Sequence, residues 1–138
     1  MKIQRQFLAI AALAAITATI CFHRVVGAHQ SVLHVNTVIF ARNGEAKDAV
    51  TTFSPKDHEI YCIADVVNQK ADAAYKFNWS RYDENEQQHL IYQQELTNQT
   101  TSQVVSKFSS QSDLPTGHYK VDLWVSGHHK QSRFDVTN

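Results

Sequence analysis

The chain has 138 residues, and its 13 Lys and Arg balance its 13 Asp and Glu. Three of the basic residues, Lys2, Arg5 and Arg24, lie in the first 28 positions, so acidic side chains outnumber basic ones by three in residues 29–138. This balance leaves no basic patch to hold a phosphate backbone, and we expect no nucleic acid partner.

The N-terminus has the pattern of a targeting segment. Lys2 and Arg5 precede an uncharged run from Phe7 to Phe22, and a small-residue site follows at Val26-Gly27-Ala28. The run is shorter than the ~20 residues that cross a bilayer as a helix. Residues 1–28 therefore predict a signal peptide or, if uncleaved, an N-terminal membrane anchor. We expect an exported protein, periplasmic or secreted, with residues 7–22 holding it to the inner membrane if the segment is retained.

Short segments of alternating apolar and polar residues make up the rest of the chain, which predicts strands and no helix. A turn-rich connection at 42–56 contains Asn43-Gly44 and Ser54-Pro55. The last two strands are joined by a turn at Ser126-Gly127. The seven expected strands are Leu33–Ala41, His58–Val67, Ala74–Tyr82, His89–Glu95, Gln103–Phe108, His118–Val125 and Gln131–Val136.

The inward phase of these strands predicts one shared core. Cys62 is the one cysteine of residues 29–138, so we expect it to be a small buried hydrophobe and the core to be held without a disulfide. The residues expected to be buried together are Ile60, Cys62, Tyr75, Phe77, Trp79, Val121, Leu123 and Phe134.

Three landmarks resemble those of immunoglobulin-like folds: Cys62 on the second strand, Trp79 on the third, and Leu114-Pro-x-Gly-x-Tyr119-x-Val121 as a tyrosine corner. The segment from about Val38 to Val136 is similar to immunoglobulin-like domains of bacterial exported and envelope proteins. Val121 stands where the second cysteine of antibody domains would be. The resemblance implies an all-β, seven-stranded immunoglobulin-like sandwich over residues 29–138, with an adhesion, assembly or accessory binding role.

No catalytic motif is present in the sequence. It has no Gly-x-Ser-x-Gly elbow, no His-Glu-x-x-His pair and no phosphate-cradling glycine loop. Asp83, Glu84 and Glu86 form a carboxylate cluster, but they lie in a polar turn and are expected to be a solvated loop. We therefore predict a protein that is not an enzyme and uses no cofactor.

The last hairpin offers the best candidate binding surface. Trp124 alternates with the apolar Leu123 and Val125, which predicts that its indole is at least partly exposed. Exposed tryptophan is enriched at protein interfaces. We expect a protein partner of the cell envelope to bind Trp124 together with its neighbours Lys120 and Asp122. The final strand is also a candidate sheet edge that accepts a strand from another chain.

Histidine supports one alternative. Cleavage after Ala28 would make His29 the mature N-terminus, and an N-terminal histidine chelates copper through its amine and its side chain. Small exported sandwiches that resemble copper carriers and copper oxygenases use this arrangement. The alternative is therefore a periplasmic copper- or zinc-binding protein in which His29 and His34 are completed by His118 or His58.

Overall fold

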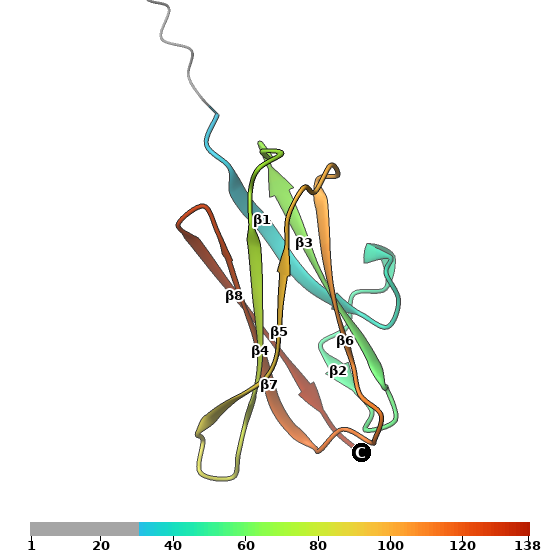
Figure 1. Cartoon of the computed structure of the whole chain (residues 1–138). Helices are drawn as coiled ribbons and strands as arrows, with labels where there is room; N and C mark the ends of the chain where they lie inside the picture. Colours follow the sequence, from blue (N-terminus) through green and yellow to red (C-terminus); the bar gives the residue numbers. More distant parts are fainter. Residues whose placement is uncertain (1–30) are drawn as a thin grey trace, which may run out of the picture. The chain divides into compact units, whose positions relative to one another are not determined.

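The computed structural model describes residues 31–138, which form strands joined by short turns (Figure 1). Within these residues there are eight strands and one short 3-10 helix, η1 (Ala46–Asp48). The strands are β1 (His34–Ala41), β2 (Thr52–Phe53), β3 (Glu59–Val67), β4 (Tyr75–Tyr82), β5 (Gln88–Leu96), β6 (Gln103–Ser109), β7 (Gly117–Val125) and β8 (His128–Val136).

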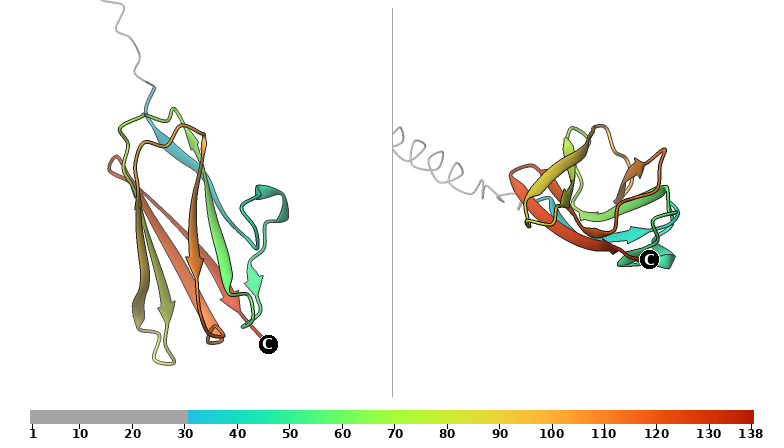
Figure 2. Two further views of the ribbon diagram at one scale, coloured as in Figure 1. Left: turned by 45° about the vertical axis from the view of Figure 1, so that its right-hand side comes forward. Right: turned by 90° about the horizontal axis from the view of Figure 1, so that it is seen from below.

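The strands make two sheets that face each other (Figure 2). One sheet has three strands in the order β1-β3-β6, and the other has five in the order β2-β8-β7-β4-β5. Neighbouring strands are antiparallel except β2, which pairs in parallel with the end of β8. The described residues are therefore a two-layer, all-β structure.

The predicted core is confirmed. Each of the eight residues expected to be buried together is at most 2% exposed. Successive side chains of a strand point to opposite faces, so one phase of each strand fills the space between the sheets. Cys62 is free and buried, and this burial raises the pKa of its thiol.

Trp79 is the largest fully buried side chain, and its ring lies among aromatic rings from both sheets. It stacks on Phe108 of β6 at 5.7 Å between centroids and meets the edges of Phe40 and Phe134. Its indole Nε1–H donates to Ser106 Oγ on β6 at 3.0 Å. A hydrogen bond therefore links the two sheets inside the core.

Tyr119 forms the predicted corner. Its ring is buried against Phe134, and its hydroxyl donates to the carbonyl oxygen of Pro115 at 2.7 Å. This contact fixes the turn that leads into β7.

The expectation of seven strands is wrong by one. The additional strand is β2, inside the connection 42–56 that was predicted as turns. It has two residues, too few to show an alternating pattern in the sequence. Its pairing is nevertheless specific, because Asp135 N–H donates to Thr51 O and Thr137 N–H donates to Phe53 O, both at 2.9 Å.

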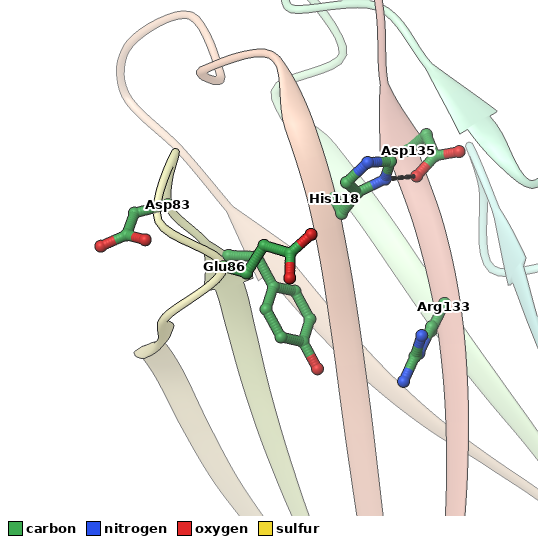
Figure 3. A pocket seen from close by; sticks show the side chains of 6 residues that line it. Asp83, Glu86, His118, Arg133 and Asp135 are labelled. Carbon is green, nitrogen blue, oxygen red and sulfur yellow. Dashed lines mark hydrogen bonds and ion pairs between the residues drawn. The ribbon is translucent and has the colours of Figure 1, made fainter.

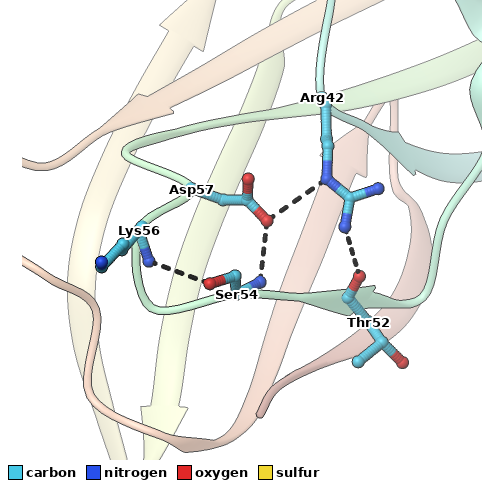
Figure 4. A network of polar contacts seen from close by, with 5 residues as sticks. All are labelled: Arg42, Thr52, Ser54, Lys56 and Asp57. Atoms are coloured by element: carbon cyan, nitrogen blue, oxygen red, sulfur yellow. Dashed lines mark hydrogen bonds and ion pairs between the residues drawn. The ribbon is translucent and has the colours of Figure 1, made fainter. Parts of the chain in front are cut away.

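A polar network holds β2 against the end of β1 and the start of β3 (Figure 4). Arg42 donates from Nη2 to the carbonyl oxygen of Thr52 at 3.1 Å and from Nε to Asp57 Oδ2 at 3.2 Å. The same Asp57 oxygen accepts the backbone N–H of Ser54 at 2.7 Å. Tertiary contacts, rather than local propensity, place this strand.

The last strand begins at His128, three residues before the predicted Gln131. Ser126 and Gly127 both have positive φ, 48° and 78°, which is the geometry of a two-residue type I′ hairpin. Such a turn lets pairing start at once, with Val125 opposite His128. Polar residues after the turn therefore belong to the strand.

Residues 1–30 lie outside the part that the structure describes, and the predicted signal peptide or anchor at 1–28 falls there. Among residues 31–138, no helix is long and apolar enough to span a membrane.

Replacing Trp79 with alanine should destabilise the domain by about 3–5 kcal/mol, because it opens a large cavity and removes the bond to Ser106. Urea denaturation measures this. The control is Trp124→Ala, which changes an exposed ring and should cost less than about 1 kcal/mol. Equal midpoints for wild type and Trp79→Ala would contradict the core described above.

Candidate outer-face binding site

The candidate site is the face of the five-stranded sheet that points away from the core, called the outer face below. The register aligns its side chains in rows across the strands. The rows on β4, β7 and β8 are Lys76, Trp124 and His129, then Asn78, Asp122 and Gln131, then Ser80, Lys120 and Arg133.

Trp124 lies on this face as the sequence predicts, with 46% of its surface exposed. Its ring stacks on the imidazole of His129, with 4.0 Å between centroids and 13° between planes. One side of the indole is therefore held by the neighbouring strand while the rest is open to solvent. This makes Trp124 an ordered, exposed aromatic surface.

Lys120 and Asp122, which were expected to bind the partner together with Trp124, lie on the same face but are nearly buried. They are 9% and 8% exposed. Lys120 Nζ is 2.9 Å from Asp122 Oδ2 and also donates to Gln88 Oε1 at 2.8 Å. Gln88 of β5 and His129 of β8 contact the pair, and alternation within β7 alone does not reveal this.

Asp122 connects this pair to the exposed tryptophan. Its second oxygen, Oδ1, lies 2.8 Å from Nε2 of His129, the ring on which Trp124 stacks. The carboxylate thus sets the position of His129, which supports the indole. In order of contact, the network that crosses the outer face is Trp124, His129, Asp122, Lys120, Gln88 and Ser80.

A cavity of about 360 Å³ lies at the other end of the outer face (Figure 3). His118 Nδ1 is 2.7 Å from Asp135 Oδ1, and the guanidinium of Arg133 lies 6.0 Å from the Tyr82 ring centroid. The His118 side chain is 79% exposed, so the dyad is open to water. The lining residues are Tyr82, Asp83, Glu86, His118, Arg133 and Asp135.

Asp83 makes several hydrogen bonds in the β4–β5 hairpin, which its sequence context does not predict. Its Oδ1 accepts the backbone N–H groups of Asn85 and Gln87, both at 2.9 Å, and its Oδ2 lies 2.8 Å from His89 Nε2. The hydrogen bond with His89, followed by those from the turn, lowers the pKa of Asp83 below its ordinary value. Asp83 therefore stabilises the β4–β5 hairpin.

Three of the four candidate metal ligands lie in the described residues, and they are placed apart. His34 is opposite Val67 at one end of β3, whereas His58 precedes Glu59 at the other end. His58 and His118 each pair with a different carboxylate, Asp113 and Asp135.

Among residues 31–138, no group of three or more His, Cys, Asp or Glu side chains is placed to hold a metal ion. His29 lies outside the described residues, so the copper or zinc alternative stays a prediction.

No family model matches the chain, and no curated protein is significantly similar to it. The chemistry of the outer face therefore carries the functional argument.

Removing one partner of the Lys120–Asp122 pair should lower the free energy of unfolding. Asp122→Ala leaves a nearly buried ammonium without its carboxylate, and we expect a loss of about 3 kcal/mol in urea denaturation. The double variant Lys120→Met with Asp122→Leu removes both charges and should lie closer to wild type. A wild-type midpoint for Asp122→Ala would show that the pair adds nothing to stability.

Asp83 should make stability depend on pH. Because folding lowers its pKa, its contacts stabilise the fold above the ordinary carboxyl pKa of about 4, and this contribution is lost as the pH falls through the lowered value. Asp83→Asn should therefore be less stable than wild type near neutral pH and nearly equal to it in strong acid. Thermal unfolding across this range measures the difference, with Glu84→Gln as control. A constant difference at all pH values would contradict the assignment.

Proposed function

We propose that the chain is a non-catalytic binding or assembly module, exported to the cell envelope, that contacts a protein partner through the outer face around Trp124. The observation that carries the proposal is an exposed indole held in place by stacking on His129. Trp is among the residues most enriched in interface hot spots. A ring that is already ordered loses less conformational entropy on binding.

We infer that the sandwich is of the immunoglobulin-like class. The order β1-β3-β6 matches strands A, B and E of that class, and β8-β7-β4 matches G, F and C. The buried Trp79 on β4 and the bond from Tyr119 to Pro115 before β7 support the same assignment. Domains of this class serve many binding roles, so the class itself does not identify the partner.

The properties of Cys62, a candidate nucleophile, also agree with a binding role. Cys62 is the one free thiol of the described residues, and it is buried with a raised pKa. An activated thiolate needs the opposite conditions, namely partial exposure and a lowered pKa. The state of this thiol therefore supports the proposal of a non-catalytic module.

Export is the part of the proposal that rests on residues 1–28. The basic start, the apolar run and the small-residue site are the features of a secretory signal. We propose that the module acts in the periplasm or outside the cell, free after cleavage or held to the inner membrane by residues 7–22. N-terminal sequencing of the exported protein tests this, and a chain found in the cytoplasm would contradict it.

Replacing Trp124 with alanine should weaken partner binding at least about tenfold without unfolding the domain, because hot-spot truncations cost about 2 kcal/mol or more. The measurement is quantitative capture of the same prey protein from the cell envelope by wild type and variant. Val67→Ala is the matched control, because Val67 is 36% exposed and lies on β3 of the other sheet. Equal capture by wild type and Trp124→Ala would remove the indole from the interface.

A further inference from the structure

The outer edge of β8 is only partly covered. The sheet order places β2 beside β8, but β2 pairs with just two of its residues, Asp135 and Val136 (Figure 1). The preceding segment, His128–Arg133, pairs with β7 on one side. Within residues 31–138 no strand forms a backbone ladder with its other side, although Ser132 Oγ donates to the carbonyl oxygen of Val38 on β1 at 3.3 Å. This segment is called the open edge below.

The backbone groups that face the open edge can be identified. Asp135 and Thr137 donate their N–H groups to Thr51 and Phe53, just before and in β2, so odd-numbered residues of β8 turn their backbone toward that side. The type I′ turn agrees, because residues that flank such a turn hydrogen-bond to each other, which turns His128 toward β7. The N–H and C=O of His129, Gln131 and Arg133 therefore point outward. No backbone group of residues 31–138 pairs with them there.

The side chains along the open edge are basic or neutral. Lys130 and Arg133 carry positive charge on opposite faces of the strand, and the first carboxylate of β8 is Asp135, where β2 already pairs. Lys130 and Arg133 make no ion pair with a carboxylate of residues 31–138. An added strand would therefore meet cationic groups on both of its faces, which favours an acidic sequence.

The opposite edge of the same sheet is less suited to accept a strand. The pairing of β4 with β5 shifts between Trp79 and Ser80, which leaves Ile91 as an extra residue in a β-bulge. A bulge at a sheet edge interrupts the row of backbone groups and increases the twist, a common protection against pairing. The open edge of β8 has no such interruption, since its register with β7 runs without a shift.

We propose that the open edge of β8 binds an extended acidic segment of a partner protein as an additional strand. Main-chain hydrogen bonds to His129, Gln131 and Arg133 provide the pairing, and Lys130 and Arg133 select for carboxylates. The inference rests on the proposed function and specifies the chemistry of the partner. Trp124, stacked on His129, then lies one strand inward and supports the edge residue that the segment contacts.

The first test uses synthetic peptides of alternating Thr and Glu, matched peptides of alternating Thr and Lys, and Thr-Glu peptides with every backbone nitrogen methylated. Calorimetry should show the acidic peptide binding at least about tenfold more tightly than the basic one. Methylation should abolish binding, because it removes the donors of the added strand. Equal affinity for both charges, no binding of the acidic peptide, or unchanged binding after methylation would overturn the proposal.

The second test changes the edge itself. Gln131→Pro removes an N–H that points outward and that no internal pair uses, so the domain should fold as wild type and lose the acidic peptide. Lys130→Glu combined with Arg133→Glu keeps the backbone and should reverse the preference toward the basic peptide. This double variant decides the question if the proline variant fails to fold. Leu90→Ala on β5 is the control and should bind as wild type.

The outcomes separate this inference from the proposed function. If the prey protein is lost with Trp124→Ala but retained with both edge variants, the outer-face function stands and the edge inference fails. If the wild type captures no partner, the proposed function itself fails. If sedimentation shows a wild-type dimer that Gln131→Pro abolishes, the occupant is a second copy of this chain, which overturns the acidic segment.

Discussion

The rest of the structure depends on the hydrogen bond between Trp79 Nε1 and Ser106 Oγ, since it joins the two sheets at the centre of the core. Ser106 extends this hydrogen-bonded chain to β5, because its hydroxyl donates to Gln94 Oε1 at 2.8 Å. A polar group buried among aromatic rings is costly unless it is paired, so a register that breaks this chain is disfavoured. The contact provides an inter-sheet link in a core where Cys62 has no disulfide partner among residues 31–138.

Fixing the inward phase of β4 and β7 also fixes what their outer face presents. With Val121 and Leu123 inside, Lys120, Asp122 and Trp124 must point outward. These three side chains differ in exposure because they differ in size and in their partners. Lys120 and Asp122 neutralise each other under the side chains of neighbouring strands, whereas the larger indole rises above them against His129. A polar layer thus supports the exposed ring of Trp124.

The two edges of the five-stranded sheet have different local structures. At β5 a bulge interrupts the row of backbone groups, whereas at β8 two residues of β2 cover the end and leave the remainder unpaired within the described residues. The network of Arg42, Ser54 and Asp57 fixes where β2 lies and therefore where the open edge stops. The length of a two-residue strand thus decides how much of the β8 backbone stays unpaired among the described residues.

The alternation of residues was sufficient to predict most strands, the core and the exposure of Trp124, because a strand's period of two is a local property of the chain. The turn at Ser126-Gly127 and the corner at Tyr119 could also be predicted from the sequence, since each depends on a few consecutive residues. The chain's own pattern therefore determined a two-layer β-structure and the face on which its candidate site lies.

Only the tertiary structure decided which polar residues of that face are covered and which edge is open. The burial of Lys120 and Asp122 depends on Gln88 and His129, which lie on other strands. The pairing of β2 with β8 joins segments about 80 residues apart in the chain. Contacts between distant segments leave no periodic trace in either one, which is why the sequence predicted the face but not its polar network.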